Sequence, residues 1–314
     1  MSLQPVFILS LPRSGSTLLQ RVLATHPAIS TASEPWLLLP LFYARRADGS
    51  TSEYHQTDSA AAINDFIDTL GSEQDYYQAV AEFALSLYRS SAGQDAAYFL
   101  DKTPRYHLII PELIQTFPEA KFIFLWRNPL AVAASMMSTW SGGNWNLHRF
   151  EIDLYEGIEN LVSASKQLGD NCFSLNFEQL VSDPDAVYPK LFEFLGLSSD
   201  AANYSSFSEV KLDGRMGDPT GIHRYQKIES ATRDNWRGLF NNPVRRRWAQ
   251  KYLDWVGADR LRYMGYDRKE LESSITNGPA SLRRLFTDTG RIIFRKVMPT
   301  PEQKELYRRR ALKQ

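Results

Sequence analysis

The sequence predicts an α/β fold in which helices cover both faces of a central parallel sheet. Short, continuously apolar runs recur along the chain at residues 6–11, 98–100, 121–126 and 173–177. Each of the first three ends in a polar turn that leads into a helical pattern, which is the order of a strand, turn and helix unit. Strands that alternate with helices favour a parallel sheet. The 314 residues, 43% of them hydrophobic, can bury one sizeable core.

The first unit contains a polar loop, Pro-Arg-Ser-Gly-Ser-Thr at residues 12–17, directly before a short helix. Unpaired N–H groups and the macrodipole at a helix N-terminus favour a bound anion. A standard Walker loop would have lysine after its last glycine, but Ser16 follows Gly15, which disfavours an ordinary kinase or NTPase. Arg13 can donate two hydrogen bonds to one oxyanion. Alone, the loop fits an anion site or a simple helix-capping turn.

Two later units repeat this arrangement, with Lys102 after the strand at 98–100 and Arg127 after the strand at 121–126. Open parallel sheets bind their ligands beyond the carboxyl ends of the strands. We therefore expect Lys102 and Arg127 at the same sheet edge as the first loop. The alternative for Arg127 is a surface ion pair.

These motifs resemble the sulfotransferases that use 3'-phosphoadenosine-5'-phosphosulfate (PAPS), over roughly the first 200 residues. In that family the first loop holds the 5'-phosphosulfate, and an arginine and a serine eight positions later contact the 3'-phosphate. The resemblance implies a P-loop nucleotide-kinase-like three-layer fold, PAPS as donor, 3'-phosphoadenosine-5'-phosphate (PAP) as product, and no required metal. The implied cofactor-binding residues are Arg13, Ser14, Gly15, Ser16, Thr17, Arg127 and Ser135. The alternative for Ser135 is a solvated helical serine.

Sulfuryl transfer requires a base for the acceptor proton and a cation for the charge on the departing phosphate. We assign the cation to Lys102. Cytosolic members of the family have a Lys-Thr-His run with histidine as the base, but Pro104 occupies the histidine position here. The layout from residues 26–27, a His-Pro pair, to Glu34 is similar to the tyrosylprotein type, which implies Glu34 as the general base. His107, five residues after Lys102, is the alternative base.

Composition limits the partners. Lys and Arg together number 36, as do Asp and Glu, so the net charge gives no reason to expect nucleic acid. We expect no transmembrane segment, because no apolar run approaches roughly 18 residues. A strand that starts close to Met1 leaves no room for a signal peptide, and the single cysteine fits a reducing compartment, so we expect a cytoplasmic protein.

The acceptor is expected to bear a hydroxyl group, in a small molecule, a carbohydrate, a lipid or a peptide tyrosine. Its specificity is expected in the polar surface loop at residues 45–59. A second loop at 217–221, followed by Arg224, Lys227 and Arg233, is expected to cover the 3'-phosphoadenosine. The sequence fits a monomer and a homodimer equally well.

The end of the chain differs from the rest. Residues 279–314 are predominantly basic with apolar residues between the arginines, which predicts an amphipathic tail after a sulfotransferase domain at 1–278. This tail is expected to pack on its own domain or on a partner subunit. Two other functions stay open, a P-loop phosphotransferase that uses ATP with magnesium and a non-catalytic nucleotide-binding protein. Glu34 and Lys102 together favour an enzyme.

Overall fold

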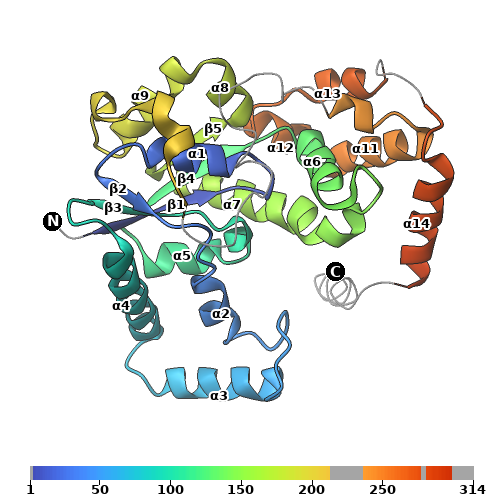
Figure 1. Ribbon diagram of the computed structural model, residues 1–314. Helices are drawn as coiled ribbons and strands as arrows, with labels where there is room; N and C mark the ends of the chain where they lie inside the picture. The colour runs from blue at the N-terminus through green and yellow to red at the C-terminus, as the bar shows by residue number, and fades with distance from the viewer. Residues whose placement is uncertain (1–2, 213–235, 277–280, 299–314) are drawn as a thin grey trace.

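A computed structural model describes residues 3–212, 236–276 and 281–298, and its centre is a parallel sheet (Figure 1). The strand order is β2-β3-β1-β4-β5, and every neighbouring pair is parallel. This confirms the predicted fold class. The strands are β1 (Gln4–Leu9), β2 (Ile29–Thr31), β3 (Tyr98–Asp101), β4 (Lys121–Trp126) and β5 (Cys172–Asn176).

Helices cover both faces of the sheet because successive strand residues point in opposite directions. In β1, Val6 and Ile8 belong to one hydrophobic cluster, whereas Phe7 and Leu9 belong to the other. The first cluster includes side chains of α1 (Ser16–Leu23), α8 (Phe177–Ser182) and α9 (Pro184–Phe194). The second includes side chains of α2 (Leu38–Tyr43), α4 (Glu73–Ser91), α5 (Ile110–Thr116), α6 (Pro129–Ser141), α7 (Ile158–Leu168) and α11 (Pro243–Val256). The three-layer arrangement is thus confirmed.

Two parts of the fold differ from the sequence-based expectation. Strand β2 was not predicted, because three residues are too few to show a periodic pattern. The loop expected at 45–59 ends at His55, where α3 (Gln56–Asp68) begins. Helix α3 buries only Ala60 and Ile67, so its sequence lacks a clear apolar stripe.

Helices α3 and α4, at residues 56–91, form a hairpin that projects from the body of the molecule, and we call it the helical arm (Figure 1). At the other end of the chain, α12 (Ala258–Tyr263), α13 (Arg268–Thr276) and α14 (Leu285–Val297) follow α11. Helix α14 packs against α11, within the expected tail. The loop expected at 217–221, its basic residues at 224, 227 and 233, and the tail beyond 298 lie outside the described residues.

Candidate active site

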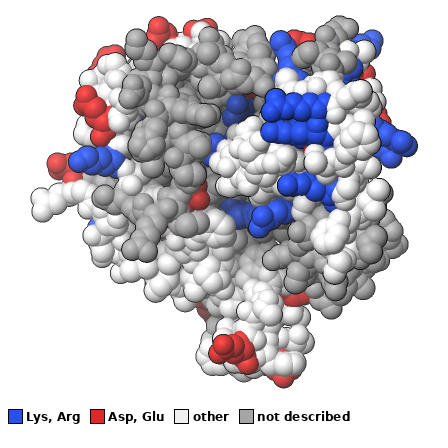
Figure 2. Space-filling model, turned by 45° about the vertical axis from the view of Figure 1, so that its right-hand side comes forward, with Lys and Arg blue, Asp and Glu red and all other residues white. Residues whose placement is uncertain are grey.

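The carboxyl ends of three neighbouring strands, β3, β1 and β4, bring the predicted residues together. Lys102 follows β3 directly, and its Nζ lies 3.3 Å from Thr17 Oγ1 in the loop after β1. Arg127 follows β4 and donates a hydrogen bond of 2.8 Å to the carbonyl oxygen of Arg13. The common edge expected from the parallel topology is therefore present. Basic side chains gather around a hollow on the side toward which the strands point (Figure 2).

The loop at residues 12–17 turns sharply into α1. Gly15 has a φ of 91° and precedes the first helical residue, and Arg13 has a φ of 71°. The amide of Ser14 donates to the carbonyl of Leu11, which closes the turn. The amides of Ser16 and of the residue after it begin the helix, where no earlier turn supplies carbonyl partners. The loop thus presents N–H groups and hydroxyls at the positive end of the helix dipole.

Gly15 is required at this position for two reasons. A left-handed φ is costly for other residues, and a Cβ there would lie 2.3 Å from Cδ2 of Phe177. We expect Gly15→Ala to lower the free energy of unfolding by about 3 kcal/mol, of which backbone strain supplies about 1 kcal/mol. The matched control is Gly142→Ala, because Gly142 has a φ of +56° and nothing within 4 Å of its Cβ position. Equal losses in denaturant titrations of the two variants would contradict the close contact.

The segment that carries Glu34 is fixed where β2 ends. Thr31 Oγ1 donates a hydrogen bond of 2.7 Å to the carbonyl of Leu100, in the neighbouring strand β3. Gln20, on α1, donates from Nε2 to the carbonyl of Ala32 at 2.7 Å. The segment is therefore tied both to the sheet and to the helix that follows the anion loop.

Glu34 and Lys102 form a buried ion pair. Lys102 Nζ lies 2.7 Å from Glu34 Oε1, and the two side chains are 2% and 10% exposed, with lysine the lower. The other carboxylate oxygen accepts a 3.2 Å hydrogen bond from Trp36 Nε1. Trp36 is itself held, because its backbone N–H donates to Thr103 Oγ1 at 3.3 Å. Trp36 was not predicted as a site residue, although it follows Glu34 by two positions.

Asp101 lies under this pair and organises the end of β3. Its fully buried carboxylate accepts hydrogen bonds from the hydroxyls of Tyr88 at 2.6 Å, Tyr106 at 3.0 Å and Thr103 at 3.0 Å. Burial raises the pKa of Asp101 to about 6, against the opposing effect of these donors and of Lys102. The acidic residue at the end of a buried strand was the only sequence signal for this network.

The raised pKa of Asp101 predicts a pH dependence of stability. The folded protein holds this proton more tightly than the unfolded chain, so the Asp101 contribution is full below about pH 4 and falls as pH rises to about 6. The difference between 3.8 and about 6 corresponds to roughly 3 kcal/mol. We expect the unfolding free energy of the wild type, minus that of Asp101→Asn, to fall by this order over that range. A difference that is constant or rises with pH would contradict the assignment.

His107, the alternative base, is enclosed in a separate cluster. Its imidazole is fully buried, and Nε2 lies 2.9 Å from Asp153 Oδ1. Arg105 Nε lies 2.7 Å from the same oxygen. A Cβ at Gly157 would approach the His107 ring to 3.3 Å, so the helical backbone packs directly on the imidazole. Compared with Glu34, His107 is therefore the less accessible group.

Arg127, Arg13 and Ser135 form a second polar cluster beside the loop. Arg13 Nε donates to Ser135 Oγ at 3.3 Å. The Arg127 guanidinium lies 4.4 Å from the ring centroid of Phe177, and the Arg13 guanidinium lies 5.8 Å from that of Trp140. The two aromatic residues were not predicted, although Phe177 directly follows β5 at the same sheet edge.

Helix α6 places Ser135 within reach of this cluster. The Asn128 side chain accepts hydrogen bonds from the amides of Leu130 and Ala131, and Pro129 occupies the first helical position. The helix start is thus fixed immediately after Arg127, and Ser135 falls in the second turn.

Two further groups bear on the site. Within residues 3–212, 236–276 and 281–298, no three His, Cys, Asp or Glu side chains are grouped to hold a metal ion. In the same part of the chain, no helix has both the length and the apolar character to cross a membrane.

Comparisons with known proteins agree with this geometry. The model of the Sulfotransferase family matches residues 5–201. Nodulation protein NoeE of Sinorhizobium fredii (strain NBRC 101917 / NGR234) is 27% identical over 288 residues, which cover 83% of this chain and 66% of that protein. Protein-tyrosine sulfotransferase 2 of Gallus gallus is 26% identical over 269 residues, with coverages of 83% and 66%. The chain thus spans slightly less than two thirds of the length of these relatives.

A solved structure supports the fold. The sulfotransferase domain of the olefin synthase from Synechococcus PCC 7002 aligns with a TM-score of 0.52 and 24% identity. The alignment covers 75% of this chain and 88% of that chain. The family match extends over more than half of the 314 residues and includes the anion loop, the Glu34–Lys102 pair and the Arg127 cluster. The chain therefore belongs to the sulfotransferase family, the PAPS-dependent family that its motifs resemble.

Proposed function

We propose that this chain transfers a sulfuryl group from PAPS to a hydroxyl acceptor, with Glu34 as the general base and Lys102 as the stabilising cation. The contacts of Lys102 carry the proposal. Its ammonium group touches Thr17, in the anion loop, and Glu34, across from that loop. A base and a cation therefore stand together beside a site suited to a phosphate-like group.

The residues fit a nucleotide that is charged at both ends. The amides and hydroxyls of residues 14–17 would hold the 5'-phosphosulfate at the start of α1. Arg127 and Ser135 would hold the 3'-phosphate, and the Arg13 side chain, 3.3 Å from Ser135 Oγ, lies between the two groups. Two arginines and one lysine at one sheet edge provide the positive charge that such a ligand requires.

The reaction follows from these positions. The acceptor oxygen attacks sulfur, Glu34 takes the hydroxyl proton, and the bond between sulfur and the bridging phosphate oxygen breaks, so that PAP leaves. Lys102 neutralises the charge that develops on the departing phosphate. Trp36 holds one carboxylate oxygen of Glu34 at 3.2 Å, which restricts the orientation of the base. The products are a sulfate ester, PAP and one proton.

The acceptor is a hydroxyl compound, for which we consider a small molecule, a carbohydrate, a lipid or a peptide tyrosine. A peptide tyrosine is supported by the similarity to protein-tyrosine sulfotransferases. The loop between α2 and α3, shortened here to residues 44–55, follows the Glu34 segment in the chain and is a candidate for acceptor selection.

Calorimetric titration of the purified chain with PAP, ATP and adenosine-5'-phosphosulfate, all without added metal, tests the donor. We expect PAP to bind most tightly, because only PAP and PAPS place a phosphate at Arg127. Preference for ATP would favour the P-loop phosphotransferase, and indifference to the 3'-phosphate would contradict the proposed site. Release of PAP from PAPS in the presence of an acceptor panel separates an enzyme from a non-catalytic nucleotide-binding protein.

A further inference from the structure

The overall charge of zero conceals two segments of opposite charge. The helical arm, residues 56–91, contains six carboxylates and one arginine. Residues 281–298, which include α14, contain five Lys and Arg residues and one acid, Asp288. Acidic side chains are visible at the lower end of the molecule (Figure 2).

The arm contains an apolar groove between its two helices. The groove has a volume of about 620 Å³, and Phe66, on its α3 side, is 66% exposed. On α4 the apolar surface continues from Ala79 to Phe83 and Leu87, each four residues further on and both exposed. The groove is lined by Ser59, Ala62, Ile63, Phe66, Ile67, Leu70, Asp75, Tyr76 and Ala79.

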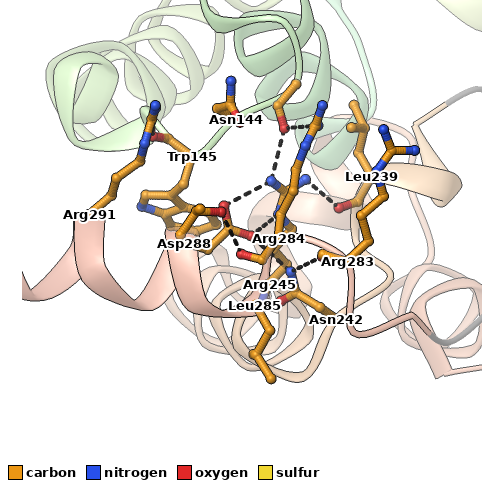
Figure 3. A network of polar contacts seen from close by, with 12 residues as sticks. Asn144, Trp145, Leu239, Asn242, Arg245, Arg283, Arg284, Leu285, Asp288 and Arg291 are labelled. Atoms are coloured by element: carbon orange, nitrogen blue, oxygen red, sulfur yellow. Dashed lines mark hydrogen bonds and ion pairs between the residues drawn. The ribbon is translucent and has the colours of Figure 1, made fainter.

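Helix α14 is held to the body of the protein along one side only. Asp288 is fully buried and accepts two hydrogen bonds from Arg245 of α11, from Nε at 2.7 Å and from Nη2 at 3.0 Å (Figure 3). Arg284 donates to the carbonyls of Gly142 and Gly143, the residues that follow α6. These contacts fix the direction of the helix.

The other side of α14 exposes large apolar side chains. Phe286 is 89% exposed and Ile293, two turns later on the same face, is 57% exposed. Phe294 is 54% exposed as well. A fixed helix with an apolar face of this size, flanked by arginines, indicates a contact with another surface.

We propose that the chain forms a two-fold homodimer in which α14 of each copy lies in the arm groove of the other. The two surfaces are both apolar at the centre and opposite in charge at the edges. Helices α3 and α14 have 13 residues each and so match in length at about 20 Å. Within one chain they lie at different ends of the molecule (Figure 1). Two reciprocal contacts close a dimer without leaving an unpaired groove.

Sedimentation velocity of the full chain tests the dimer with Phe66→Ser and Phe286→Ser. Both side chains are exposed, so neither change should unfold the protein. Each variant alone alters both contacts, and we expect its dissociation constant to rise at least about tenfold. An equimolar mixture of the two variants retains one unaltered contact per heterodimer, from the α14 of one variant to the arm of the other. We therefore expect the mixture to form heterodimers where each variant alone is monomeric.

The matched control is Tyr54→Ser, which removes a 72% exposed ring beside the arm but outside the groove, and we expect it to dimerise as the wild type does. A monomeric wild type at high micromolar concentration would overturn the proposal. So would dimers of Phe286→Ser, which indicate an arm-to-arm contact, or a mixture that stays monomeric. Binding of monomers to anionic vesicles through Phe286 would assign α14 to a membrane surface instead.

Discussion

Replacing Glu34 with glutamine is expected to lower turnover by about a hundredfold or more while PAP affinity changes less than about threefold. Glutamine has the same shape and keeps an oxygen that can accept from Lys102 or Trp36, but it cannot take the acceptor proton. The carboxylate contacts neither Arg13 nor Arg127 among the contacts described above, so the nucleotide should bind nearly as before.

The same substitution removes one partner of a buried ion pair. Lys102 is 2% exposed in its side chain, and breaking such a pair costs on the order of 3 kcal/mol. The folded fraction must therefore be measured along with turnover, which is followed as PAP release from PAPS. Glu159→Gln, on the exposed side of α7, is the control for the amide substitution itself.

Two readouts separate a base from a residue that merely positions Lys102. If Glu34 is the base, the loss of wild-type activity at low pH disappears in Glu34→Gln, because no carboxylate is left to be protonated. A phenol acceptor that is already ionised at the assay pH should also recover much of the lost rate, since it has no proton to give. Near-normal turnover in Glu34→Gln would contradict the assignment and would pass the base role to His107 or to water.

The sheet edge could be predicted because strands leave a strong local signal. Continuous apolar runs such as residues 121–126 identified buried strands, and parallel strands carry their following residues to one edge. That rule alone placed Lys102 and Arg127 beside the anion loop. Glu34 required the family resemblance, because the strand that precedes it, β2, is only three residues long.

The supporting residues could not be predicted because they depend on contacts between distant segments. Asp101 accepts from Tyr88, on α4, and Phe177, after β5, packs on Gly15 and Arg127. No local pattern specifies such pairs. The arm escaped notice for a related reason, since α3 exposes most of its surface and so lacks the periodicity by which buried helices are recognised.

Arg127→Ala is expected to weaken PAP binding by about 30- to 100-fold, which is the loss of charge-assisted hydrogen bonds to one phosphate. Adenosine-5'-phosphosulfate has no 3'-phosphate, so its affinity should fall only slightly. A small loss remains because Arg127 also donates to the carbonyl of Arg13, and its removal loosens the anion loop. Calorimetric titration of both ligands measures the two effects separately.

The ratio of the two affinities identifies what Arg127 does. Arg262→Ala removes the same charge at a 79% exposed side chain and controls for long-range electrostatics. Arg127→Lys should recover part of the PAP affinity, because lysine restores the charge but not the two-pronged donor geometry. Equal losses for both ligands would mean that Arg127 only shapes the loop through Arg13. An unchanged PAP affinity would place the 3'-phosphate elsewhere. A selective loss leaves Arg127 as the group that distinguishes a nucleotide with a 3'-phosphate from one without it.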